Sequence, residues 1–230
     1  MTESIDYFSK DHRLRKVATK VALRAREKMY RQFVAAIPFD DTTTVIDIGV
    51  TPDRDLADSN FFERLYPHPE RLTATSIEDA SFLEEQHPGL TFVRTDGATL
   101  PFTDGQFGIA FSSAVVEHVG DRAAQRRFVE EMCRVSDRFF LTTPNRWFPI
   151  ELHTFLPFVH WLPQRWHQAV LRRLGLRFWA ETANLDLLTA DELRGLFPAD
   201  AVVRISRNRT LGWCSNLVAH GWVTRAGPGP

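Results

Sequence analysis

Cysteine is scarce in this sequence, and neither a strong charge imbalance nor a long apolar run is present. The two cysteines, Cys133 and Cys214, stand alone, so neither a disulfide framework nor a cysteine-based zinc site is indicated. The formal net charge of -1 gives no overall attraction to nucleic acid. The polar N-terminus lacks the apolar core of a signal peptide, and no apolar run approaches the roughly 18 residues of a spanning helix. We therefore expect a cytoplasmic protein that contacts at most the inner membrane surface.

Lysine is confined to the N-terminal segment, where all four lysines alternate with arginines. Apolar residues recur there at helical spacing, so residues 1–40 are predicted to hold one basic amphipathic helix. This apolar stripe consists of Leu14, Val17, Val21, Ala25, Met29 and Phe33. The helix either packs on the core with a solvated basic face or serves as a lid or a contact for an anionic surface.

Residues 41–225 alternate between short β-branched runs and helical stretches. The strand-like segments are 44–48, 72–77, 91–95, 107–112, 138–142, 201–206 and 216–223. This alternation predicts an α/β domain with a seven-stranded, mainly parallel sheet, helices on both faces and a C-terminal antiparallel hairpin. Ligands of such sheets bind at the carboxyl ends of the strands.

Two helices carry clear start signals, and one long segment interrupts the alternation. Asp121 is a predicted N-cap for a helix over 121–135, and Thr189 with Glu192 forms a capping-box pattern. Residues 147–180 are dense in aromatics, proline and arginine, and are too long for an ordinary connection. We interpret them as an insertion with a helix in its second half. The tail 226–230 is predicted to be disordered.

Four motifs follow the predicted strands in order: VIDIGVTPD from Val45, TDGATLPF from Thr95, FSSAVVEHVG from Phe111 and TTPNRWFP from Thr142. Here the chain resembles the class I S-adenosylmethionine-dependent methyltransferases, specifically the small-molecule enzymes of methyltransferase type 11. The resemblance covers about residues 43–144 and implies a Rossmann-like fold with S-adenosylmethionine as the cofactor. It also implies a methyl transfer to an acceptor.

The resemblance implies a cofactor-binding role for several residues. Asp47 would meet the amino end of the methionine moiety, beside Gly49, and Glu78 would accept from the ribose hydroxyls. Strict alignment would place Ser76 in the ribose position instead of Glu78. Asp96 would accept from the adenine amino group, with Gly97 following. Ser113 would lie beside the methionine moiety.

The sequence departs from the family pattern after Gly49, where Val50, Thr51, Pro52 and Asp53 replace a glycine-rich turn. The methyl group of the cofactor is already activated, so a general base is needed only for protonated or weakly acidic acceptors. His118 and His153 are the candidates for that base, although an isolated histidine such as His118 is more often structural. No cluster of metal ligands is apparent in the sequence, so no metal is predicted.

The sequence favours transfer of a methyl group to a small-molecule or lipid- or glycan-linked acceptor. The aromatic insertion is either a lid over the substrate or a small apolar cluster beside the main core. Together with the basic helix, it would suit a peripheral membrane contact. One alternative is a non-catalytic Rossmann-like binding or scaffold protein, motivated by the altered loop after Gly49. A nicotinamide-dependent oxidoreductase fits less well, because GxGxxG is absent.

Overall fold

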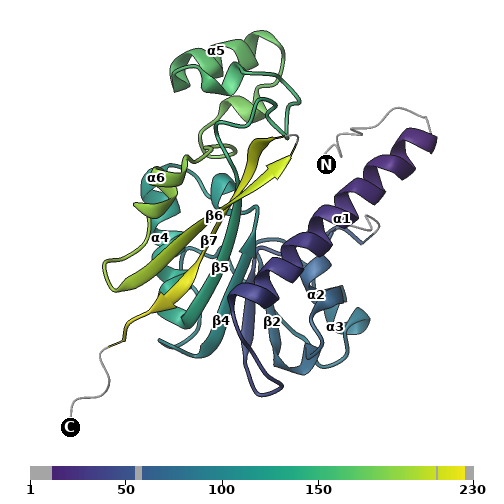
Figure 1. The fold of residues 1–230 in the computed structure, drawn as a ribbon, viewed down its shortest axis with the longest axis vertical. Helices are drawn as coiled ribbons and strands as arrows, with labels where there is room; N and C mark the ends of the chain where they lie inside the picture. The colour runs from purple at the N-terminus through teal and green to yellow at the C-terminus, as the bar shows by residue number, and fades with distance from the viewer. Residues whose placement is uncertain (1–11, 55–58, 211, 226–230) are drawn as a thin grey trace.

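A single seven-stranded sheet organises the molecule (Figure 1). The computed structural model describes residues 12–54, 59–210 and 212–225, with side chains from residue 23 onward. The strand order is β3-β2-β1-β4-β5-β7-β6; the first five strands are parallel, and β7 runs antiparallel to both neighbours. The strands are β1 Val45–Ile48, β2 Leu72–Ser76, β3 Thr91–Arg94, β4 Phe107–Ser113, β5 Ser136–Pro144, β6 Ala201–Thr210 and β7 Trp213–Val223. The predicted Rossmann-like fold with its C-terminal hairpin is confirmed.

Helices cover both faces of the sheet. They are α1 His12–Ala36, α2 Phe61–Leu65, α3 Phe82–Gln86, α4 Arg122–Val135, α5 Gln164–Arg173 and α6 Ala190–Arg194. Single 3-10 turns are η1 Pro69–Arg71, η2 Val116–His118, η3 Val159–Trp161 and η4 Phe178–Ala180. Both predicted start signals hold: Asp121 accepts from the Ala124 N–H, and Thr189 with Glu192 forms a complete capping box.

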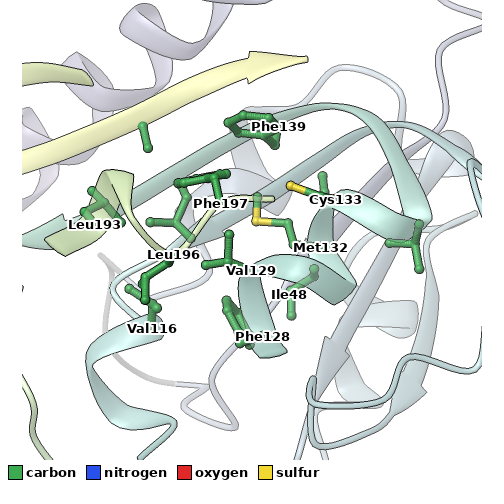
Figure 2. Close-up of a cluster of buried hydrophobic side chains, with 14 of the residues drawn as sticks. Ile48, Val116, Phe128, Val129, Met132, Cys133, Phe139, Leu193, Leu196 and Phe197 are labelled. Atoms are coloured by element: carbon green, nitrogen blue, oxygen red, sulfur yellow. The ribbon is translucent and has the colours of Figure 1, made fainter. Parts of the chain in front are cut away.

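The side chains of the sheet alternate between two separate apolar cores because successive residues of a strand point to opposite faces. On one face, Ile46 and Ile48 of β1 pack with α4 and with the segment around α6. Figure 2 shows Phe128, Val129 and Met132 of α4 in this core. Phe139 of β5 belongs to the same core and stacks on Phe197, with ring centroids 4.7 Å apart. On the other face, Val45 packs with α1, α2 and α3.

Helix α1 runs diagonally across the second face (Figure 1). Met29 and Phe33 from the predicted stripe are buried there, whereas Ala25 is exposed. Phe33 is fully buried and meets Phe111 of β4 and Phe140 of β5 edge to face. The side chains of Leu14, Val17 and Val21 lie outside the described ones. The C-terminal half of the helix is therefore part of the sheet's core, while Arg24, Lys28 and Arg31 stay exposed.

The segment 147–180 projects beyond the carboxyl end of β5, at the same end of the molecule as the N-terminal end of α1 (Figure 1). It contains η3, α5 and η4, and its helix begins after Pro163 and ends before Gly175, which has φ +79°. Within the described part of the chain, no helix combines the length and apolar character that a bilayer crossing requires. The expected disorder of 226–230 concerns residues outside the described ranges.

We predict that α1 contributes to global stability through Phe33. Phe33→Ala should lower the free energy of unfolding by about 3–5 kcal/mol, because it leaves a cavity among fully packed aromatic rings. The neighbouring substitution Val34→Ala should cost less than about 1 kcal/mol, since Val34 is 44% exposed. Chemical denaturation of both variants checks this, and equal losses would mean that α1 does not stabilise the sheet.

Candidate active site

A cleft of about 480 Å³ opens where the four parallel strands β1 to β4 end. Each strand leads into a short segment that lines it, as expected for ligand sites in open α/β sheets. Its lining includes Ile48, Gly49, Thr51, Ser76, Glu78, Asp96, Gly97, Val115 and His118. Its size is that of a pocket for a cofactor or another small molecule.

Gly49 allows the closest approach in this cleft. It has φ +102°, and a Cβ atom placed there would lie 2.3 Å from Cγ2 of Val115, in the turn after β4. Its N–H donates to the Thr75 carbonyl oxygen at 2.8 Å, which joins the end of β1 to the end of β2. Only glycine satisfies both the backbone conformation and this contact.

Asn60 stabilises the loop after Gly49 in place of the missing glycines. The Thr51 N–H donates to Oδ1 of Asn60, and Nδ2 of Asn60 donates to the Thr51 carbonyl oxygen, each at 2.9 Å. Asn60 itself has φ 48°, which asparagine tolerates better than most residues. The departure from the family pattern thus leaves an ordered loop start at the mouth of the cleft.

Ser76 and Glu78 both line the cleft at the end of β2. Ser76 is the last residue of the strand and is buried, and its Oγ accepts from the Glu78 N–H at 3.3 Å. Glu78 is exposed on the cleft. The two candidates for the ribose contact therefore lie together, and the choice of Glu78 stays a prediction.

Asp96 both stabilises a turn and lines the cleft. Its Oδ1 accepts from the N–H groups of Ala98 and Thr99 at 3.0 and 3.3 Å, which fixes the carboxylate after β3. This use of Oδ1 leaves Oδ2 to accept from a ligand. Gly97 follows with φ +72°, and a Cβ atom placed there would lie 3.1 Å from Cε2 of Phe128 of α4, so this part of the cleft lining leaves little room for a side chain.

Asp47 and Ser113 lie outside the lining of the large cleft, in a neighbouring cavity of about 100 Å³. The two spaces share Gly49, Val50 and Thr51, so the cavity adjoins the cleft at the end of β1. The Oγ of Ser113 lies 3.1 Å from Oγ1 of Thr142. Asp47 and Ser113, the predicted methionine-binding residues, therefore share one cavity, and that cavity adjoins the cleft that Asp96 lines.

The small cavity also contains Glu63 of α2 and Arg26 of α1, which the sequence motifs did not indicate. Asp47 and Glu63 are buried, and burial together with the negative charge of Glu63 raises the pKa of Asp47 well above its usual range. Burial also raises the pKa of Glu63. A cationic group would relieve this unfavourable burial of two acids. No sequence signal marks Glu63, because α2 is only one turn long.

His118 and His153, which are far apart in the sequence, lie with their ring centroids 4.7 Å apart and their planes nearly perpendicular. His118 lines the cleft from η2, and His153 comes from the insertion. Burial lowers the pKa of His153, but its 2.6 Å hydrogen bond to Glu151 and the charge of that residue raise it overall. Burial alone would raise the pKa of Glu151, but the hydrogen bonds and the charge of His153 lower it to about 2.

A family model described as a methyltransferase domain matches residues 60–138. The match begins after Gly49, in keeping with the altered loop, and includes the segments that carry Glu78, Asp96 and His118. No curated protein matches the sequence.

Solved structures share the fold at low sequence identity. The N-methyltransferase NodS from Bradyrhizobium japonicum, in complex with S-adenosyl-L-homocysteine, is 14% identical with a TM-score of 0.55, over 87% of each chain. A Haloferax volcanii protein in complex with the Trm112 methyltransferase activator is 14% identical with a TM-score of 0.56, over 90% of this chain and 94% of that one. A possible histamine N-methyltransferase from Thermotoga maritima is 13% identical with a TM-score of 0.54, over 93% and 95%.

The strand order is that of the Rossmann-like fold that these solved structures share, and residues 60–138 match a methyltransferase domain, in agreement with the resemblance of the sequence motifs.

We predict that Gly49→Ala destabilises the protein by about 2–5 kcal/mol, since it combines backbone strain with a clash against Val115. Gly175→Ala is the matched control, because Gly175 also has a positive φ but has no atom within 4 Å of an added Cβ. It should cost only about 1–2 kcal/mol. Chemical denaturation measures both changes, and equal losses would show that the contact with Val115 has no energetic weight.

Proposed function

We propose that the chain transfers the methyl group of S-adenosylmethionine to a small-molecule or lipid- or glycan-linked acceptor bound between the cleft and the aromatic insertion. The observation that carries this proposal is the single cleft that Glu78, Asp96 and His118 all line. The insertion returns beside His118, since His153 and Trp179 lie against it with ring centroids 4.7 and 6.2 Å away.

In the proposed complex, adenosine lies toward Asp96 and Glu78, and the amino-acid end of the cofactor lies toward Asp47. The small cavity beside Asp47 holds two buried acids and Arg26, a composition that suits a group with one ammonium and one carboxylate. Gly49 joins the two spaces because it lines both. The sulfonium would then lie near the end of β1, with its methyl group toward the η2 side.

The residues around the acceptor mainly align a nucleophile with the S–CH₃ bond and exclude water. If the acceptor carries a proton, His118 and His153 are the groups in place to remove it. His118 faces the cleft, whereas the raised pKa of His153 favours its protonated form. Because it lines the cleft, His118 is the better placed of the two to accept a proton from the acceptor.

The scaffold and oxidoreductase alternatives have less support. The altered sequence after Gly49 motivated the scaffold alternative. Two hydrogen bonds between Thr51 and Asn60 hold the start of this loop, and the cleft beside it remains unfilled by protein atoms. A nicotinamide-dependent oxidoreductase is disfavoured by the match to a methyltransferase domain.

Asp96 offers a direct test of the cofactor site. Asp96→Asn keeps the Oδ1 acceptor that closes the turn but removes the charge, so the fold should persist while S-adenosylmethionine affinity falls about 10- to 100-fold. Isothermal titration calorimetry with S-adenosylmethionine and S-adenosylhomocysteine measures this loss. Asp41→Ala, an exposed acid far from the cleft lining, is the control and should bind like wild type. Wild-type affinity in Asp96→Asn would remove the adenine contact from the proposal.

The surface of the insertion favours an acceptor presented on a lipid. Trp166 and Phe178 are each 57% exposed, and Phe155 is 55% exposed. Arg165, Arg172, Arg173 and Arg177 are exposed on the same segment. Aromatic side chains beside cations suit the interface of an anionic membrane, and the N-terminal end of α1 lies at the same end of the molecule (Figure 1). These cations form a local patch on a chain of slightly negative net charge, which suits nucleic acid less well.

We expect the protein to co-sediment with anionic liposomes at low salt and to be released at high salt. A Trp166→Ala/Phe178→Ala variant should lose most of this binding. Trp222→Ala is the matched control, because Trp222 is 41% exposed but pairs with Arg138 near the start of β5, away from the insertion. Absence of sedimentation in the wild-type protein at low salt would leave a small soluble acceptor as the favoured substrate.

A further inference from the structure

Three potential metal ligands converge where the insertion meets the cleft. Glu117 and His118 come from η2, and His153 comes from the insertion. One ligand atom of each residue lies within 4.8 Å of the others. Nε2 of His118 is 3.9 Å from Oε1 of Glu117. Ligand atoms that share one ion lie about 3–3.5 Å apart, so small side-chain rotations would close the site.

The remaining polar atom of each ligand is already engaged. Oε2 of Glu117 accepts from Oγ1 of Thr143 at 2.9 Å. Nδ1 of His118 lies 2.8 Å from the Asn184 carbonyl oxygen. Nδ1 of His153 lies 2.6 Å from Oε1 of Glu151. Hydrogen bonds of these kinds fix the tautomer and orientation of metal ligands, and here they leave Nε2 of each histidine for the ion.

The free oxygen of Glu117 is the second indication. The Glu117 side chain is completely buried, and its Oε1 has no hydrogen-bond partner among the described residues. A buried carboxylate oxygen without a partner is unfavourable unless a cation is nearby. His118 Nε2 at 3.9 Å is too far for a hydrogen bond, so the histidine alone does not satisfy that oxygen.

We propose that Glu117, His118 and His153 bind one divalent transition-metal ion, with Zn²⁺ as the best match. Two imidazole nitrogens and one carboxylate oxygen are a donor set that Zn²⁺ and its neighbours in the first transition row accept, whereas Mg²⁺ and Ca²⁺ prefer oxygen ligands. The ion would connect the turn after β4 to the insertion. Its three protein ligands leave at least one coordination position open.

The open position faces the proposed acceptor space, because His118 also lines the cofactor cleft. We infer that this position takes a hydroxyl oxygen of the acceptor, an inference that rests on the proposed function. The metal would lower the pKa of that hydroxyl, and its proton would pass to water. The oxygen would then bond to the methyl carbon while the S–C electron pair stays on sulfur, giving the thioether product. In this arrangement the two histidines are ligands and neither is the base.

Metal binding is tested on the full chain after treatment with a chelator. Titration with Zn²⁺ should give one site per chain, and Co²⁺ should give d–d absorption bands of a site with nitrogen ligands. A saturating excess of about 100-fold over the dissociation constant should raise the melting temperature by about 5–10 °C. Glu117→Gln and His153→Gln should each abolish the bands and the shift. His87→Gln, at the end of α3 and away from the cluster, should behave like wild type.

The variant Glu151→Gln gives a readout that a purely structural role of Glu151 would not produce. It should weaken Zn²⁺ binding about 10- to 100-fold while the affinity for S-adenosylmethionine is unchanged. If Glu117→Gln does not fold, His153→Gln still tests the site, because His153 lies on the insertion with 20% of its side chain exposed.

Wild-type Zn²⁺ binding no tighter than that of His153→Gln would overturn the metal site. Zinc binding without any S-adenosylmethionine binding would keep the metal site and overturn the proposed methyl transfer. S-adenosylmethionine binding without zinc binding would do the reverse, and would return His118 to the role of base.

Discussion

The parallel pairing of β1 with β2 and β4 is the constraint on which the rest of this structure depends. Asp47 is in register with Ala74 on one side and with Phe111 on the other, so the neighbouring strands end at nearly the same level. Each of these parallel strands must then leave the sheet through a turn at one crowded edge. Gly49 meets this requirement at the narrowest point, against Val115, and the cleft is the space that the diverging turns leave open.

Acidic side chains are buried at two places along this edge of the sheet. Asp47 and Glu63 lie on the α1 and α2 side of the sheet, and Glu117 lies at the start of the turn after β4. Burial of a carboxyl group is unfavourable unless a partner compensates for it, so buried acids at a cleft commonly belong to functional sites. The Glu63 and Glu117 side chains both carry oxygen atoms without a hydrogen-bond partner in the described part of the chain. Both places therefore suit a cation: an ammonium group beside Asp47, and a metal ion beside Glu117.

Local patterns were sufficient for most of the sheet and for two helix starts. Short apolar runs separated by turn residues predict strands that are buried on both faces of the sheet, as at β1 and β4. The caps at Asp121 and Thr189 act through hydrogen bonds within three residues, so the sequence contains the whole signal. The short helices α2 and α3 have too few residues for a helical period, and they were not predicted.

The sequence by itself determined the fold class, the family resemblance and the places of Gly49, Glu78, Asp96 and Gly97 at the strand ends, because these depend on local conformation and strand order. Only the tertiary structure decided which side chains share a space. It placed Asp47 with Glu63 and Arg26, and it brought His153 to Glu117 and His118. Those contacts depend on how α1, α2 and the insertion pack on the sheet, and packing between distant segments leaves no short-range pattern in the sequence.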